Sequence, residues 1–332
     1  MKTLNTNSVN KVQPLLRTRF NKLGQWKSAA CIALLASSTA MPAMSAPALY
    51  NFQEVADPMD TMFTQLLGVN NNGQIAGYFG DGTKVPNNGF TLTLTGHHLL
   101  PNFTSENFPN ATQTQVISIN NLSKTGGFYV DAQGQTHGFI RDNNGVYQKI
   151  DAPKTAFNQI LGVNDLGESA GYSSTDPTGA TIQKAFIHNS AGFVYVPLKA
   201  PSIGNSQATG INDANIVSGF YVDANGNNFG FLWDTNNKTI KSLQYPKANF
   251  TQALGINNAG QVVGVYSMDN GATTHGFVYK QGQYTRVDEP NSANLSATLI
   301  NGINDRGEIV GFYTDKAGDT VGFIGTPKTP LW

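Results

Sequence analysis

One segment recurs six times along this chain, and the repetition constrains the fold more than any other feature. Its clearest copy is Leu254–Gly264, in which an Asn opens a turn between two apolar runs. The turn residues are Asn70, Asn120, Asn164, Asn212, Asn257 and Asn304, at spacings of 50, 44, 48, 45 and 47 residues. A period of this length is typical of solenoids and propellers, in which each repeat is one supersecondary unit.

Two further marks fall in the same register of every copy. A glycine stands seven residues after each Asn, at Gly77, Gly127, Gly171, Gly219, Gly264 and Gly311. A small residue precedes Phe 19 to 22 residues after each Asn, at Gly89-Phe90, Gly138-Phe139, Ala185-Phe186, Gly230-Phe231, Gly276-Phe277 and Gly322-Phe323. Three marks in six registers exclude a chance pattern.

Each copy has the pattern of four short strands. In the fifth copy these are Thr251–Ile256, Gln261–Ser267, His275–Lys280 and Gln283–Val287, separated by turns rich in Asn, Asp and Gly. The second strand is apolar on both faces, as expected for a strand between two neighbouring sheets. Four antiparallel strands in a repeat of this length indicate a propeller blade.

The two ends of the repeated region complement each other. The sixth copy stops after its third strand, at Phe323–Gly325, whereas residues 50–58 resemble the fourth strand of the fifth copy, Tyr284–Pro290. The N-terminal strand would therefore complete the last blade and hide both open edges, whereas an open solenoid would need terminal caps. We predict an all-β fold, a six-bladed β-propeller of four-stranded antiparallel blades over residues 47–332.

Three copies carry a triplet around the small residue before Phe: His137-Gly138-Phe139, Lys184-Ala185-Phe186 and His275-Gly276-Phe277. With the Gly-Ile-Asn-(Asn/Asp)-x-Gly core, this pattern resembles the bacterial HAF-repeat family of "probable extracellular repeat" proteins, named for a His-Ala-Phe triplet. The resemblance covers residues 50–325 and implies export and a repetitive β fold, without a reaction common to the family. Two copies depart from it, because residues 120–123 and 212–215 lack the turn glycine.

Residues 1–46 have the pattern of a secretory signal peptide. Six basic residues and no acidic one precede the short apolar stretch Ala29–Ala40, and Ala43–Ala46 supplies small residues for cleavage. The stretch is too short to span a bilayer. We therefore expect a secreted, periplasmic or cell-surface protein without a membrane span. Cys31 lies in this leader, so the mature chain has no cysteine.

Removal of the leader makes the chain acidic. The whole sequence has 21 basic and 21 acidic residues, so the mature part keeps 15 basic residues against 21 acidic ones, a net charge of −6. Nucleic-acid binding depends mainly on neutralising phosphates with a basic surface. The composition therefore argues against a nucleic-acid partner.

Glutamine and phenylalanine recur at fixed positions at the start of the predicted first strands, Gln in five copies and Phe in three. The glutamines are Gln65, Gln115, Gln159, Gln207 and Gln252, and the aromatic residues are Phe63, Phe157 and Phe250. The loops that enter the first strands and the loops between second and third strands should lie at this same end of the blade. Both carry acidic residues, and Asp151 and Asp288 stand in the loops between copies. We predict a ligand site in which these residues surround the mouth of the central channel.

Each part of that set also has a structural interpretation. The glutamines could join neighbouring blades, and the phenylalanines could fill the core between them. The six loop aspartates fit ordinary turn chemistry, and they are Asp81, Asp131, Asp176, Asp223, Asp269 and Asp315. His137 and His275 share a register whose other residues vary, which favours packing.

No cofactor is predicted. The segment Asp223–Asn227 has the 1-3-5 oxygen spacing of a calcium loop but lacks the glycine at position six. A structural cation such as calcium, bound there or among the acids at the channel mouth, is an alternative.

Three functions are compatible with the sequence. The first is a binding module for glycan, envelope polymer or an extracellular protein. The second is a polysaccharide lyase or glycoside hydrolase at the same channel mouth, although the catalytic motifs that can be recognised in sequence are absent. An enzyme would show as symmetry breaking, and the first two copies diverge most, with His97, His98 and Glu106. The third is a structural or adhesive surface protein.

Overall fold

The computed structural model describes residues 49–95, 100–199, 204–269, 271–293 and 297–328, and these residues form 24 strands. The predicted leader, with Cys31, lies outside the described residues, as do His97 and His98. Among the described residues no helix is long and apolar enough to cross a membrane. The all-β class predicted from the repeat is confirmed.

The strands of the first three copies follow the predicted order. The first copy forms β2 (Thr64–Val69), β3 (Gln74–Phe79), β4 (Asn88–Thr95) and β5 (Leu100–Ser105). The second forms β6 (Gln113–Ile119), β7 (Thr125–Val130), β8 (Thr136–Arg141) and β9 (Tyr147–Ile150). The third forms β10 (Phe157–Val163), β11 (Ser169–Ser174), β12 (Lys184–Asn189) and β13 (Gly192–Tyr195).

The last three copies repeat the pattern, with one strand taken from the N-terminus. The fourth forms β14 (Ser206–Ile211), β15 (Ile216–Val222), β16 (Asn228–Asp234) and β17 (Thr239–Leu243). The fifth forms β18 (Phe250–Ile256), β19 (Val262–Ser267), β20 (His275–Lys280) and β21 (Gln283–Val287). The sixth forms β22 (Thr298–Ile303), β23 (Ile309–Thr314) and β24 (Thr320–Pro327), and β1 (Tyr50–Val55) joins them.

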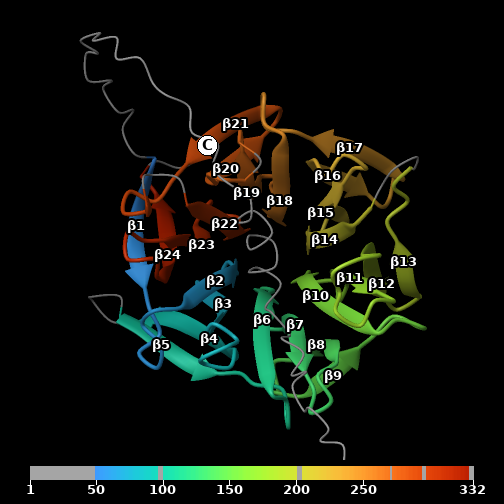
Figure 1. Cartoon of the computed structure of the whole chain (residues 1–332), viewed down its shortest axis with the longest axis horizontal. Helices are drawn as coiled ribbons and strands as arrows, with labels where there is room; N and C mark the ends of the chain where they lie inside the picture. Colours follow the sequence, from blue (N-terminus) through green and yellow to red (C-terminus); the bar gives the residue numbers. More distant parts are fainter. Residues whose placement is uncertain (1–48, 96–99, 200–203, 270, 294–296, 329–332) are drawn as a thin grey trace, which may run out of the picture.

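The four strands of each copy pair antiparallel and form what we call a blade, numbered in chain order. Single parallel bridges, Thr136 with Phe157 and Asn228 with Phe250, join blade 2 to blade 3 and blade 4 to blade 5. The strands pair consecutively from the inner first strand to the outer fourth strand. The blades stand around a common axis (Figure 1). Each first strand contacts the first strand of the next blade, and β22 contacts β2, so the contacts form a complete cycle. This arrangement is a β-propeller.

The sixth blade closes the ring through its fourth strand. β1 pairs antiparallel with β24, from Tyr50 opposite Pro327 to Val55 opposite Gly322. Tyr50 and Val55 are buried. The prediction that the N-terminal strand completes the last blade is therefore confirmed, and no blade edge is left open at the junction of the two chain ends.

Two of the repeated residues, the glycine of the second strand and the Phe of the third strand, are cross-strand partners. In every blade the glycine of the second strand lies directly opposite the Phe of the third, as in Gly264 opposite Phe277. A Cβ on Gly264 would lie 2.0 Å from the carbonyl oxygen of Gln252 and 3.0 Å from the Phe277 ring. The glycine is therefore required for the ring to lie across the strand, and these Phe side chains are among the most buried in the protein.

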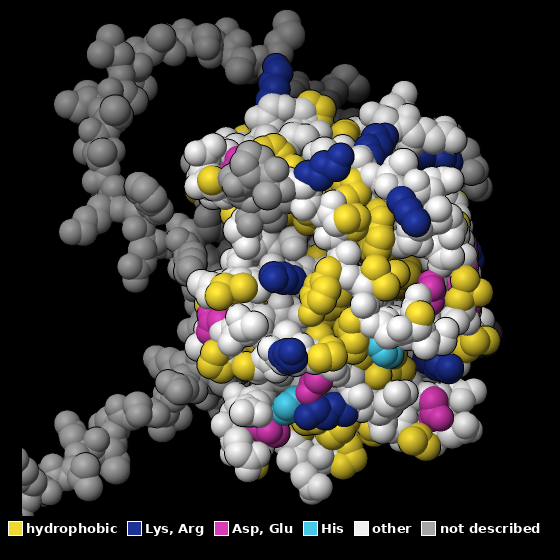
Figure 2. Space-filling model, turned by 90° about the vertical axis from the view of Figure 1, so that its right-hand side faces the viewer, with side chains coloured by type: hydrophobic (Ala, Val, Ile, Leu, Met, Phe, Trp, Pro, Cys, Tyr) yellow, Lys and Arg dark blue, Asp and Glu magenta, His cyan; other side chains and the backbone are white. Residues whose placement is uncertain are grey.

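Basic side chains do not form a continuous surface on the outer wall shown in Figure 2. Lys and Arg lie singly there, among neutral and apolar residues. This wall lacks the basic stripe that phosphate binding requires.

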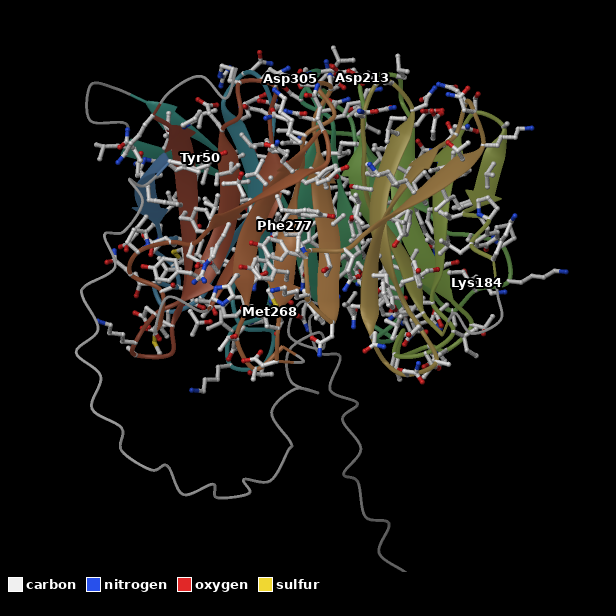
Figure 3. All side chains as sticks on the ribbon, turned by 90° about the horizontal axis from the view of Figure 1, so that it is seen from above. Tyr50, Lys184, Asp213, Met268, Phe277 and Asp305 are labelled. Atoms are coloured by element: carbon white, nitrogen blue, oxygen red, sulfur yellow. The ribbon has the colours of Figure 1, made fainter. Side chains whose placement is uncertain are left out.

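The two ends of the propeller axis differ in chemistry. We call one end the turn face, because it carries the six turns that begin at Asn70, Asn120, Asn164, Asn212, Asn257 and Asn304. The other end, the loop face, carries the loops between blades and those between second and third strands. Figure 3 shows Asp213 and Asp305 on the turn face, with Met268 toward the opposite end.

Because β1 closes the ring, we predict that a charge at a buried position of this strand lowers the free energy of unfolding. Val55→Asp places a carboxylate beside Leu66 and Phe90. It should lower the free energy of unfolding by about 3 kcal/mol, because the buried charge has no partner there. Asn51→Asp, at an exposed position of the same strand, is the control. Chemical denaturation of both variants measures the difference, and equal stabilities would contradict the role of β1.

Candidate functional site

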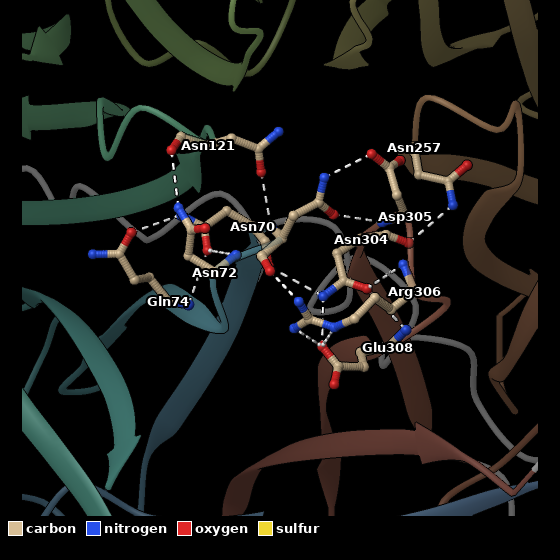
Figure 4. A network of polar contacts seen from close by, with 10 residues as sticks. Asn70, Asn72, Gln74, Asn121, Asn257, Asn304, Asp305, Arg306 and Glu308 are labelled. Carbon is tan, nitrogen blue, oxygen red and sulfur yellow. Dashed lines mark hydrogen bonds and ion pairs between the residues drawn. The ribbon is translucent and has the colours of Figure 1, made fainter.

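Six asparagines join the blades at the turn face. The side-chain Nδ2 of each first turn residue donates to the backbone carbonyl of its counterpart in the next blade. Asn70 donates to Asn120 at 2.9 Å. Asn304 donates back to Asn70 at 3.1 Å (Figure 4). The remaining four bonds, at 2.8 to 3.2 Å, complete the circle through Asn120, Asn164, Asn212 and Asn257.

A second circle of bonds runs through the following residue of each turn. Its backbone N–H donates to the side-chain Oδ1 of its counterpart in the next blade, at 2.8 to 2.9 Å throughout. The members are Asn71, Asn121, Asp165, Asp213, Asn258 and Asp305. The second circle needs only an acceptor oxygen, and for this reason both Asn and Asp occur in it.

The first circle needs a side-chain amide, because the same side chain both accepts and donates hydrogen bonds. The Oδ1 of Asn212 accepts the N–H groups of Ala214 and Ile216 within its own turn, while its Nδ2 donates to Asn257. An Asp would keep the turn and lose the donor. The sequence predicted the turn role of these asparagines, but not the bond between blades.

A polar cavity of about 70 Å³ lies inside these two circles on the turn face. Its three carboxylates, Asp165, Asp213 and Asp305, each accept an Asn side-chain amide at 2.7 to 3.3 Å. The described residues contain no group of three or more His, Cys, Asp or Glu side chains placed to hold a metal ion. The polar atoms of this cavity therefore serve the bonds between blades.

A β-bulge interrupts every first strand at the same position. The bulged residues are Leu67, Ile117, Leu161, Thr209, Leu254 and Asn301. A bulge re-aims one side chain, and these six line a second cavity of about 70 Å³ in the middle of the channel. Glycine follows most bulges because the strands approach closely: a Cβ on Gly162 would lie 2.8 Å from the Cα of Gly210.

Toward the loop face the channel is filled with apolar side chains. Phe63, Phe250 and Leu254 belong to one buried cluster, and Phe157 and Leu161 belong to another. Ile117 packs against both clusters. The three phenylalanines predicted to stack on a ligand are therefore core residues, as their structural interpretation held.

The five glutamines are also buried, at 3% exposure or less. Gln115, Gln207 and Gln252 donate to a side chain near the third strand of the preceding blade, namely Asn87, Gln183 and Asn228 respectively, at 2.8 to 3.0 Å. Gln65 accepts the Tyr78 hydroxyl, and Gln159 is buried beside its register partner Tyr172. The predicted channel-mouth site needs correction on this point, because three of these amides face the preceding blade, two lie beside a Tyr of their own blade, and all five are covered.

The six loop aspartates cap their own turns. Each accepts backbone N–H groups from the residues that follow it, as Asp223 does from Asn225 and Asn227. The second carboxylate oxygen of Asp223 accepts the Asn227 amide. The segment that resembled a calcium loop is therefore a hydrogen-bonded turn.

Asp151, one of the predicted ligand-binding acids, belongs to a polar cluster on the loop face. His137 contacts Asp151 through Nδ1 at 2.7 Å and Asp131 through Nε2 at 3.2 Å. The Lys149 ammonium lies 3.0 Å from the same Asp151 oxygen. Because this histidine bridges a loop between blades and a loop between strands, the predicted placement of both loop types on one face is confirmed.

Aromatic rings support this cluster from the side. Phe108 stacks on Tyr129 at 3.7 Å with an interplanar angle of 5°, and it meets Tyr147 edge to face at 5.2 Å. The Tyr129 ring lies 5.2 Å from the His137 ring. Burial, with the charges of Asp151 and Asp131, raises the pKa of Tyr129. We call this set the blade-2 cluster: Phe108, Tyr129, His137, Tyr147, Lys149 and Asp151.

Blade 5 carries the same arrangement, built around the second predicted acid, Asp288. His275 Nδ1 lies 3.1 Å from an Asp288 oxygen, and Arg286 Nε donates to that oxygen at 2.5 Å. Burial works against the charge of Arg286, but the bond to Asp288 raises its pKa overall. We call this set the blade-5 cluster: Tyr245, Tyr266, His275, Tyr284, Arg286 and Asp288.

The two clusters match in their ring geometry. Tyr245 stacks on Tyr266 at 3.5 Å and 3°, and it meets Tyr284 edge to face at 5.3 Å. The Tyr266 and His275 rings are 5.3 Å apart, against 5.2 Å in blade 2. The interpretation of His137 and His275 as packing residues was incomplete, since both are held by carboxylates. The signal was present in the sequence as the joint recurrence, in two copies, of four identical residues together with an aromatic residue and a cation.

The cation of each cluster reaches solvent, whereas the carboxylate is less exposed. The side chains of Lys149 and Arg286 are each 49% exposed, against 22% for Asp151 and 10% for Asp288, and the histidines are largely covered. Each cluster therefore presents charged groups at the surface while its rings and histidine form a fixed base.

Glu106 differs in chemistry from the residues in the same register of the other blades. The residue in this register is apolar in every other blade: Val55, Ile150, Val196, Leu243 and Val287. Glu106 bonds to Thr125 and lies 3.6 Å from Arg141. Burial raises the pKa of Glu106 despite these partners. Glu106 is nearly inaccessible and so acts within the blade core.

Comparison with known proteins adds little beyond the fold. No protein-family model matches the sequence, and no curated protein matches it. The HAF resemblance therefore stays a prediction.

Several solved structures share the general architecture. They include a fucose-specific lectin from Aleuria aurantia (10% identity, TM-score 0.49, covering 82% of this chain and 98% of the lectin). The β-propeller domain of the Trilobed protease from Pyrococcus furiosus (9%, 0.45, 81% and 98%) and TolB from Acinetobacter baumannii (10%, 0.49, 80% and 63%) are also among them. Similarity at this level gives no information about ligand or activity.

The asparagine circle predicts a large loss of stability for a substitution at one turn position and a small loss at the next. Asn212→Asp should lower the free energy of unfolding by about 2 kcal/mol, because a carboxylate would face the Asn257 carbonyl. Asp213→Asn keeps the Oδ1 acceptor used by Asp165 and loses only the exposed bond from the Asn258 amide, which also donates to Asp305, so it should lower the free energy of unfolding by less than about 1 kcal/mol. Thermal or denaturant unfolding compares the two. Equal losses would show that the direction of the bond is unimportant.

The loop carboxylates predict an acid-sensitive contribution to stability. The backbone N–H of Thr178, with the hydroxyls of Thr178 and Thr181, lowers the pKa of Asp176 to about 2, from 3.8. Its contribution is thus present above pH 4 and is lost as the pH falls toward 2. The melting temperature of Asp176→Asn should therefore fall less between pH 5 and pH 2.5 than that of the unmodified protein. Identical falls would contradict this role of Asp176.

Proposed function

We propose that the protein is an exported β-propeller binding module that recognises glycan through the blade-2 and blade-5 clusters on its loop face. The observation that carries the proposal is the recurrence of one six-residue arrangement in two blades. The register of its histidine holds Asn88, Lys184, Phe229 and Val321 in the other blades. A residue set that scaffolding alone required would occur in every blade.

The chemistry of each cluster suits a polyhydroxylated ligand. A sugar hydroxyl both donates and accepts hydrogen bonds, so a cation beside a carboxylate can satisfy it from both sides. Hydrogen bonds to charged groups are the stronger ones, and the covered rings beneath support these charged groups. The side chains of Lys149 and Asp151, and of Arg286 and Asp288, supply the pairs.

The size of the clusters favours glycan over a protein partner. A stable protein interface buries about 800 Å² on each side, with a continuous apolar centre. Each cluster instead exposes a few charged tips around a covered base, on a separate blade. Such a surface matches one or two sugar units. A protein partner is the other outcome that a binding screen would reveal.

The leader at residues 1–46 supports delivery to the periplasm, the cell surface or the medium, where envelope and extracellular glycans lie. The resemblance to the HAF-repeat family supports the same location. The mature net charge of −6 and the scattered basic residues fit a neutral ligand better than a polyanion.

A second candidate function is polysaccharide cleavage, which one observation in blade 6 favours. Glu54 accepts the Tyr313 hydroxyl at 2.5 Å and the Asn291 amide at 2.8 Å, and Asn291 also donates its N–H to Glu289. Burial raises the pKa of Glu289, and the Glu54 charge adds to this effect. Glycoside hydrolysis uses two carboxyl groups, one of which acts as a general acid with a raised pKa. Turnover on a polysaccharide panel, lost in Glu289→Gln, would promote this candidate.

The binding proposal predicts that both clusters contribute to glycan retention. The double variant Asp151→Asn/Asp288→Asn should bind its best array glycans at least about tenfold more weakly, since each charged hydrogen bond contributes about 1.5–3 kcal/mol. Asp142→Asn, on the same blade as Asp151 but in a hairpin at the other end of the sheet, should bind unchanged. A glycan array probed with residues 47–332 measures both. Retention equal to the control would move the site elsewhere.

A further inference from the structure

The position of the two clusters adds a feature that neither has alone. Blades 2 and 5 are separated by two blades in each direction around the ring, so they lie opposite each other. Figure 1 shows β7–β9 and β19–β21 on opposite sides of the axis. The propeller therefore carries two like sites related by half a turn.

Both sites also face the same way. Asp151 and Asp288 occupy the same register, in the loops that lead out of blades 2 and 5, and Lys149 and Arg286 stand two residues before them. Both loops belong to the loop face. A single ligand surface lying across that face would therefore meet both clusters at once.

The blades between them break the pattern in more than one register. Besides the histidine position, the register of the cation holds Ser105, Tyr195, Ser242 and Glu54 in the other blades. Glu54 reverses the charge. In the described residues, only blades 2 and 5 thus combine a cation, a histidine and a carboxylate in these registers.

From this geometry we infer that the protein binds bivalently and that its ligand is a glycan polymer, or a glycan-coated surface, that presents the same unit repeatedly. This inference rests on the proposed function. A second contact made by an already attached protein is intramolecular, so two weak sites on one rigid face hold a repetitive ligand far more tightly than a single unit. The rigid ring fixes the separation of the sites, and a matching spacing in the ligand selects among polymers.

A glycan array printed at high and low density tests the inference, with dissociation measured for five proteins. These are the unmodified protein, Asp151→Asn, Asp288→Asn and the double variant, with Asp142→Asn as the folded control. On dense spots the unmodified protein should dissociate at least about 10²-fold more slowly than either single variant. On sparse spots these three should dissociate alike, and the double variant should be retained on neither.

The outcomes separate the two proposals. If one single substitution removes all binding and the other has no effect, the protein has one site and the bivalent inference is overturned while glycan binding stands. The same holds if dense spots retain the unmodified protein no longer than the single variants. If no spot retains any of the proteins, or if neither single variant nor the double variant changes binding, glycan binding by these clusters fails and the bivalent inference fails with it.

Discussion

The propeller depends on two closed circles of hydrogen bonds at its turn face. In the first, an asparagine amide of each blade donates to the backbone of the next blade, and in the second a backbone N–H donates to a side-chain oxygen. Each bond joins residues about one repeat apart, except the pair that joins the sixth blade to the first. The circles thus link each blade to the next at the inner end of the turns, and β1 completes the outer side of the sixth blade.

The residues that hold the ring together recur in every blade, whereas residues at other positions differ between blades. The turn asparagine, the Gly–Phe pair and the bulge occur in all six blades because each meets a neighbour at van der Waals or hydrogen-bond distance. The loop-face registers of the third and fourth strands carry no such constraint, and there the blades diverge. The matched clusters of blades 2 and 5, the buried Glu106 and the acid pair of blade 6 all lie in these freer registers or next to them.

The residues that the sequence placed together at one end of the channel point in different directions in the structure. Phe250, Gln252 and Asp288 all belong to the loop-face half of blade 5, so the sequence placed them together. The strand then turns Gln252 toward Asn228 of the preceding blade, and Phe250 packs into the channel with Leu254. Asp288 lies beyond the strand, and its carboxylate meets His275 and Arg286 near the surface. Register alone does not distinguish these three directions.

The sequence by itself determined the repeat, the four strands of each copy, the turn chemistry and the pairing of the chain ends. These features are local, or they repeat often enough for the period to expose them. Only the tertiary structure decided that the asparagines form circles, that the channel is filled toward the loop face, and that two distant blades hold matching clusters. Contacts such as Asn304 with Asn70, or Phe108 with Tyr147, join residues far apart in the chain. Their geometry is set by how neighbouring blades pack, and no periodicity in the sequence specifies it.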